Sequence, residues 1–272
     1  CASRLLGDWW PEEAADWLHR SEALFHRFAA MSPYGAEGFS CINRGLPEGT
    51  APDGFMTRDL AMALWAGIQL VNSGKVELRE TLFDLAQQIL DRQIREDQAE
   101  YGYWGHFREF ASLPHSEKAN THHDVGHDTG SVLAFNVLPL IELVRRFPSD
   151  TRISAIRQAI HDFARHFALP ACKAKPFLLL PQGVFGAEGL LDFCGPWHGT
   201  NVTYGYFASM TIRLGDFCKL PELQDAAVGN MQWICGLHAG ITRESMAGAV
   251  VWHEPIPEGV AVPYSQIIAV GR

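Results

Sequence analysis

The stretch NTHHDVGHDTGSVLAFNVLPLIELVRRF, residues 120–147, decides how the fold is predicted. Its first half gathers three histidines and two aspartates between His122 and Asp128, and its second half is an apolar run that ends at two arginines. The first N–H groups of a helix have no partner inside that helix, so a polar cluster that leads into a helix start can hold a substrate or an ion. The stretch therefore predicts a functional cluster followed directly by a helix.

Apolar residues with helical spacing continue on both sides of this stretch. Helix ends are marked by Pro11, which opens one helix, by Gly74, which follows another, and by Pro170, which is expected to close a third. The pair Trp9 and Trp10 is expected to pack the N-terminus against the core. The predicted helices cover residues 11–31, 57–71, 76–94, 151–168, 201–214 and 221–236, and one more follows the polar cluster and ends at Arg145 and Arg146.

Helices joined by short connections, with long polar and aromatic loops between them, predict an all-α fold. Because no exact repeat is present, we expect an (α/α) toroid of helical hairpins rather than a regular solenoid, in a single catalytic domain that covers residues 1–272. Cys1 is an unusual first residue, and the chain ends at Arg272 without an obvious stop. We therefore expect the chain to be part of something longer and the toroid to be incomplete.

The charge pattern excludes several classes of protein. The formal net charge is −9 and the lysines and arginines are not clustered, so we expect no nucleic-acid partner. No apolar run reaches the roughly 18 residues that a membrane-spanning helix needs, so we expect no membrane partner. The chain has no phosphate-binding loop, no dinucleotide fingerprint and no nucleophile elbow, and we expect no cofactor.

The cysteines are scattered without C-x-x-C spacing, which favours buried free thiols and a reducing compartment. We therefore expect a cytoplasmic location, with a secreted or periplasmic one as the alternative if an N-terminal segment is removed. The cysteines are Cys1, Cys41, Cys172, Cys194, Cys218 and Cys235.

Two patches resemble the six-hairpin glycosidases, in particular the family nine glycoside hydrolases. Residues 230–250, NMQWICGLHAGITRESMAGAV, are similar to the late helix that ends in W-I-L-G-x-N-P in that family; the pattern is kept at Trp233, Ile234 and Gly236 and departs at His238 and Ala239. Residues 123–128, HDVGHD, look like the W-H-D-A-G-D segment of the family, with one inserted residue and without its Trp.

The resemblance implies a carbohydrate substrate and hydrolysis of a glycosidic bond. In the family, the two aspartates of the motif position and activate the attacking water, and a later glutamate is the acid. Carried over to this sequence, Asp124 and Asp128 handle the water, with His123 beside them. Glu254 is the nearest candidate for the acid, and Glu109 is the second.

The residues of the cluster leave alternatives open. If Asp124 and Asp128 lie on one helical turn, their spacing places both on one face, which suits binding of one water or ion. A structural alternative is that Asp128 or Thr129 caps the following helix. His123 and His127 also stand four residues apart, and with one aspartate they would supply three zinc ligands, although we expect no metal.

Aromatic residues separated by glycines in residues 101–110 form a second candidate region. Tyr and Trp rings stack on sugar rings, and Arg108 or Glu109 would add hydrogen bonds. The alternative is a loop that its own aromatics pin to the core, and the same choice applies to the aromatics near residue 200. The predicted substrate-binding residues are Tyr103, Trp104, Arg108, Glu109, His127, Trp197, His198 and Tyr204.

Two other functions remain open on the same scaffold. In a polysaccharide lyase or sugar epimerase, His123 or His127 together with Tyr103 or Tyr204 would abstract a proton next to a uronate carboxylate. An excess of Arg and His over carboxylates around the site would favour this function. A non-catalytic sugar-binding or scaffold protein is the third possibility.

Overall fold

The computed structural model describes residues 1–30, 55, 57–99, 102–108, 128–129, 136–174, 177–181, 183–185, 190–192 and 201–235. Most of these residues are helical. The α-helices are α1 (Ala2–Leu6), α2 (Pro11–Ala30), α3 (Thr57–Asn72), α4 (Arg79–Leu90), α5 (Leu138–Arg146), α6 (Ile153–Asp162), α7 (Leu169–Lys173), α8 (Asn201–Cys218) and α9 (Glu222–Cys235). The other elements are the 3-10 turns η1 (Val76–Leu78) and η2 (Glu96–Gln98), the π-helical segment η4 (Phe163–Ala168), and the strands β1 (Phe107–Arg108), β2 (Asp128–Thr129), β3 (Gly183–Phe185) and β4 (Leu190–Asp192).

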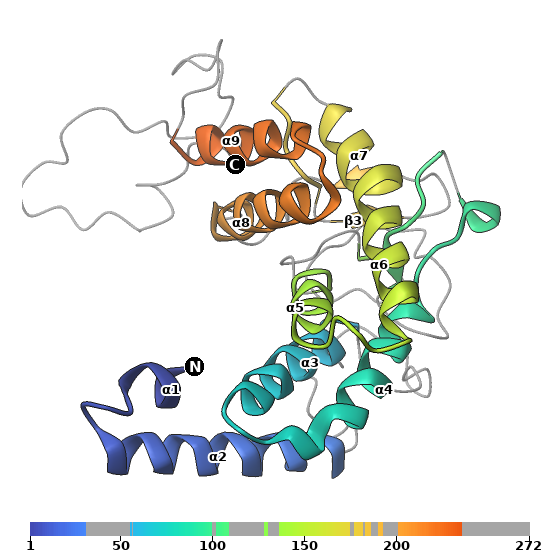
Figure 1. Ribbon diagram of the computed structural model, residues 1–272. Coiled ribbons are helices and arrows are strands. Elements are labelled where there is room, and N and C mark those ends of the chain that lie inside the picture. Colours follow the sequence, from blue (N-terminus) through green and yellow to red (C-terminus); the bar gives the residue numbers. More distant parts are fainter. Residues whose placement is uncertain are drawn as a thin grey trace, which may run out of the picture.

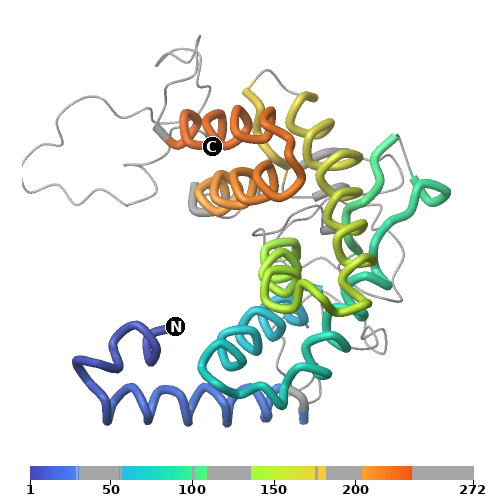
Figure 2. Tube along the Cα trace, viewed as in Figure 1, coloured from blue at the N-terminus to red at the C-terminus, as the bar shows by residue number. Residues whose placement is uncertain are grey.

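The helices form hairpins that follow one another along a curved arc (Figure 1 and Figure 2). α3 packs on α4, α5 on α6, and α8 on α9. α5 contacts both α3 and α8, so these three helices form an inner layer on the concave side of the arc, whereas α4, α6, α7 and α9 form an outer layer. The prediction of a mostly helical fold built of hairpins is confirmed for this part of the chain, and a closed toroid remains a prediction.

Several helices lie where their periodicity predicted them. α2 and α3 begin at Pro11 and Thr57 as expected, and α8 and α9 begin at or next to the predicted residues. The predicted helix 76–94 divides into the turn η1 and the helix α4. In each case the apolar face of one amphipathic helix meets the face of its neighbour, so the local pattern suffices to locate the helix.

The prediction that a helix begins at the histidine–aspartate cluster is wrong. Asp128 and Thr129 form β2, and α5 begins only at Leu138, with Pro139 in its first turn. β2 pairs with two strands from distant parts of the chain, and a local apolar period cannot reveal such pairing. Asp128 therefore lies in a strand and does not cap α5.

The strands form one antiparallel sheet in the order β1-β2-β3-β4. β1 and β2 belong to the connection from α4 to α5, and β3 and β4 belong to the connection from α7 to α8. Both connections lead from an outer helix to the next inner helix. The sheet thus joins the two segments that precede α5 and α8, and it brings residues far apart in sequence to one place.

The core runs continuously through the hairpins, from Phe25 in α2 to Leu223 in α9. α3 contributes Leu64 and Ile68, which are fully buried. The aromatic pair near the N-terminus does not take part: Trp9 is 75% exposed and Trp10 is 48% exposed, so the prediction that they pack the N-terminus down is wrong. Both lie in the short turn between α1 and α2, where the chain has little neighbouring structure to bury them.

The outer layer contains a π-helical segment. The helix predicted at residues 151–168 was expected to close at Pro170. This prediction is wrong, because α6 continues through η4 into α7, which ends at Lys173. Proline has no N–H to donate to the carbonyl four residues earlier, which here belongs to His166. That carbonyl accepts a long hydrogen bond of 3.5 Å from the backbone N–H of Trp104, so a residue outside the helix replaces the missing donor.

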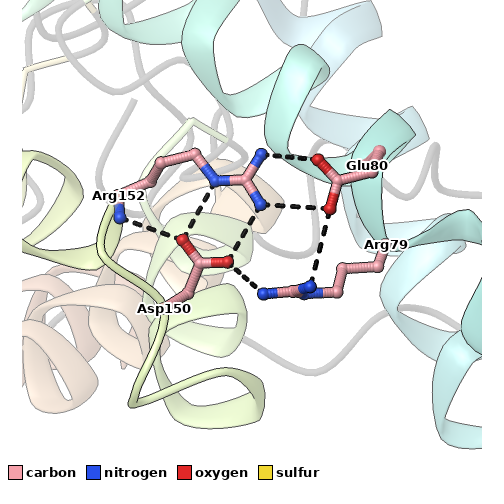
Figure 3. A network of polar contacts seen from close by, with 4 residues as sticks. All are labelled: Arg79, Glu80, Asp150 and Arg152. Carbon is pink, nitrogen blue, oxygen red and sulfur yellow. Dashed lines mark hydrogen bonds and ion pairs between the residues drawn. The ribbon is translucent and has the colours of Figure 1, made fainter.

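A network of charged side chains joins the start of α4 to the turn between α5 and α6 (Figure 3). Asp150 accepts hydrogen bonds from the guanidinium of Arg152 at 2.9 Å through both carboxylate oxygens and from Arg79 at 2.5 Å. Arg152 also donates to Glu80 at 2.9 and 3.2 Å. The Arg152 guanidinium lies 3.7 Å from the centroid of the Phe83 ring. The network therefore connects two hairpins by both charge and stacking.

The network predicts a pH-dependent stability. The Arg152 guanidinium, which bonds directly to Asp150, holds the pKa of that carboxyl well below its usual range. The contribution is complete above the unfolded-state pKa of about 3.9 and is lost as the pH falls toward the lower folded-state pKa. Asp150→Asn should lower the melting temperature at pH 7, and its difference from the wild type should shrink steadily as the pH falls below about 4.

Thermal melts of the wild type and the variant from pH 7 downward measure this difference. Asp84→Asn is the matched control, since Asp84 is exposed on α4 and its carboxylate has no partner in the described residues. A pH-independent difference between the wild type and Asp150→Asn would contradict the assignment.

Two cysteines have the predicted environment. Cys172 and Cys218 are buried free thiols, and burial raises the pKa of both, to about 12 for Cys218. Such thiols are poor nucleophiles because the thiolate is disfavoured.

Within the described residues, no helix has the length and apolar character needed to cross a bilayer.

Candidate functional site

β1 has neighbours on both of its edges. On one edge it pairs with β2, and on the other Phe107 bridges to Gln93. The N–H of Ile94 donates to the carbonyl of His106 at 2.8 Å, and the N–H of Arg108 donates to the carbonyl of Arg92 at 2.9 Å. A strand of two residues is thus held like the middle strand of a sheet, which fixes the backbone at Arg108.

The segment before β1 packs against the outer helix. The side-chain amide of Gln93 donates to the carbonyls of Gly105 at 2.7 Å and Ala159 at 2.8 Å, which ties the segment to α6. The Trp104 ring stacks on the His166 ring with centroids 3.7 Å apart. The Tyr103 ring meets Phe167 edge to face, with centroids 6.4 Å apart. These contacts correspond to the structural alternative, in which the loop's own aromatics hold it on the core. Tyr103 and Trp104 are only partly buried. Sugar binding by these two residues stays a prediction.

A buried arginine anchors β1 to the first residue of α3. Arg92 is 6% exposed, and its guanidinium donates to the Phe55 carbonyl at 2.7 Å and to the Thr57 hydroxyl at 3.1 Å. The Thr57 hydroxyl in turn donates to the carbonyl of Arg108. Because each of these groups is removed from water, each needs its partner, and the three segments are held in one fixed arrangement.

Arg108 is the predicted substrate-binding residue that this arrangement presents. Successive strand residues project to opposite faces. Phe107 is fully buried, with its ring 6.0 Å from that of Phe163, so Arg108 projects away from the core and is partly buried. In the register of β1 and β2, Arg108 is the partner of Asp128. The sheet thus brings together one predicted catalytic position and one predicted substrate-binding position that are far apart in sequence.

Sequence reasoning missed two residues of this arrangement, Arg92 and Thr57. Arg92 follows the apolar helix α4 directly and looks like a solvated residue at a helix end. Thr57 is the first residue of α3, where a hydroxyl commonly caps the helix. The signal that could have pointed to Arg92 is its place in a polar pair with Gln93, directly after the apolar helix α4 and before the aromatic loop.

The other predicted residues fall into three cases. Tyr204 is 1% exposed in α8, and its ring meets Phe207 at 6.1 Å and Trp233 at 6.4 Å, so it packs between α8 and α9. Asp128 is described by its backbone position in β2. The residues that lie outside the described part of the chain are His123, Asp124, His127, Glu109, Trp197, His198 and Glu254.

A cavity of about 220 Å³ lies among α1, α2 and α3, with Trp17, Leu18, Gln69 and Leu70 in its lining. None of the predicted site residues lines it. Among the described residues, no group of three or more His, Cys, Asp or Glu side chains could hold a metal ion. The predicted zinc ligands His123 and His127 are not among those residues.

Comparison with protein-family models, with curated proteins and with solved structures finds no match to this chain. The resemblance to six-hairpin glycosidases thus stays at the level of the two motifs. The geometry of the sheet is the basis for any assignment of function.

Proposed function

We propose that this chain belongs to a carbohydrate-active enzyme that hydrolyses glycosidic bonds and that Asp128 acts in its catalytic site. The observation that carries the proposal is the register of β1 and β2, which makes Asp128 the cross-strand partner of Arg108. An aspartate beside an arginine on paired strands suits a site in which one residue acts on water and the other binds a polar substrate.

The surrounding architecture supports this proposal. The sheet occupies the connections from outer to inner helices, where loops from several hairpins can contribute to one site. Glycoside hydrolysis requires a second carboxyl group that acts as the acid. The candidates for it, Glu109 and Glu254, and the second water-binding residue, Asp124, come from residues outside the described part of the chain.

The decisive experiment combines a substrate screen with one conservative variant. Neutral and uronate-containing oligosaccharides are incubated with the protein, and new reducing ends are measured. Asp128→Asn should lower the turnover of any accepted glycan by about 10²- to 10⁴-fold, since the amide keeps the shape but cannot take up a proton. Asp84→Asn should leave turnover unchanged.

Thermal melting shows whether Asp128→Asn remains folded. Unchanged turnover in a folded Asp128→Asn protein would refute the assignment of this residue. The absence of new reducing ends with every glycan would refute hydrolysis itself.

A polysaccharide lyase or sugar epimerase is the second candidate. The observation that favours it is the residue types that the pairing of β1 brings together in the described part of the chain: two arginine positions, Arg92 and Arg108, lie beside one aspartate position, Asp128. Proton abstraction next to a carboxylate requires positive groups that stabilise the resulting anion. A lyase would produce a new double bond, measured by ultraviolet absorbance, in the same screen.

A further inference from the structure

We propose that the Arg108 guanidinium binds the carboxylate of a uronate residue in the substrate. The inference rests on the proposed carbohydrate-active function and names the class of sugar that the site prefers. It follows from the hydrogen bonds that hold the Arg108 backbone, from the lack of an anionic partner for its side chain among the described residues, and from the shape and charge of the guanidinium.

The backbone of Arg108 is fixed from three directions. Its N–H donates to the Arg92 carbonyl at 2.9 Å, its carbonyl accepts from the Thr57 hydroxyl, and its cross-strand partner is Asp128. Phe107 is fully buried next to it and sets the face on which Arg108 lies. Because the backbone is already fixed, only the side chain must become ordered on binding, which favours selective recognition.

The Arg108 side chain has no anionic partner in the described part of the chain. Other arginines there that are buried or take part in packing do have partners: Arg92 donates to Phe55 and Thr57, and Arg152 binds Asp150 and Glu80. No hydrogen bond or ion pair of the Arg108 guanidinium occurs among the described residues, although the side chain is partly buried. A partly desolvated charge without a partner favours a ligand that supplies one.

A carboxylate fits this guanidinium better than a neutral hydroxyl does. The planar fork of arginine matches the two oxygens of a carboxylate, and such paired hydrogen bonds are stronger than those to uncharged groups.

The test uses two substrates that differ in one group. An acidic oligosaccharide is compared with its carboxyl-reduced form, which has the same linkages and a hydroxymethyl group in place of each carboxylate. The wild type should prefer the acidic form. Arg108→Gln should lower kcat/KM for the acidic form by about 10- to 100-fold, mainly through KM, and change the reduced form by less than about 3-fold.

Two further variants sharpen the test. Arg108→Lys keeps the charge but not the fork and should fall between the wild type and Arg108→Gln. Arg20→Gln, on the exposed face of α2, removes the same charge far from the sheet and should match the wild type. Equal losses on both substrates, or equal preference of the wild type for both, would overturn the inference.

Calorimetric binding of the same two oligosaccharides separates this inference from the proposed function. Selective binding of the acidic form that disappears in Arg108→Gln supports the uronate site even if no bond is cleaved. If Asp128→Asn abolishes turnover while Arg108→Gln alters neither binding nor kinetics, the proposed function stands and the uronate site is refuted.

Discussion

Phe163→Ala is expected to lower the free energy of unfolding by about 3–5 kcal/mol, as is usual for removal of a fully buried aromatic ring. Phe163 is 0% exposed at the point where α6 becomes η4. Its ring lies 6.0 Å from that of Phe107 and 5.5 Å from that of Phe167. The cavity left by the ring would therefore lie between the outer helix and β1.

Urea unfolding followed by circular dichroism measures this loss. Phe163→Leu keeps most of the volume and should cost roughly 1–2 kcal/mol. Phe217→Ala removes the same ring from a partly buried position and should cost less than Phe163→Ala. Similar losses at Phe163 and Phe217 would show that the contact between η4 and β1 is not a centre of packing.

Gly105→Ala is the second change for which we expect a large effect. Gly105 has a φ of +90°, and a Cβ there would stand 2.5 Å from the carbonyl oxygen of Asp162. The positive φ costs about 1–2 kcal/mol for alanine. The collision with backbone adds a further loss of about 1–3 kcal/mol, since the segment before β1 must move away from α6.

Gly102→Ala is the matched control for this change. Gly102 has a φ of +83°, and no atom of the described residues lies within 4 Å of the Cβ position. The difference between the two variants in unfolding free energy thus isolates the collision from the backbone conformation. Equal destabilisation by the two substitutions would mean that Gly105 does not approach Asp162 closely.

The parts of the fold that sequence predicted correctly depend on local patterns. α2 and α3 follow from apolar residues repeated along each helix, and the hairpins follow from the short connections. The strands depend on partners far along the chain, so the helix was wrongly expected to begin directly after the polar cluster. Pro170 was wrongly taken as a helix end because the donor that replaces its missing N–H comes from Trp104, in another segment.

The candidate site shows the same division. Sequence identified Arg108 and Asp128 separately, one in an aromatic loop and one in a polar cluster, and the strand register places them opposite each other. Arg92 could not be predicted, because its role depends on the carbonyl of Phe55 and the hydroxyl of Thr57. Tyr204 is of a residue type that is common in sugar-binding sites, but it is buried like a core residue.

The π-helical segment η4 has a consequence for how relatives of this chain can differ in length. A π-helical turn amounts to one extra residue in an α-helix, and one residue turns an α-helix by about 100°. Without that residue, the buried face of α7, which includes Cys172, would rotate away from the core. The widened turn is also where Trp104 and Gly105 meet the helix. The length of the helix and the conformation of the segment that carries Arg108 are therefore coupled: a deletion in one would be tolerated only with a compensating change in the other.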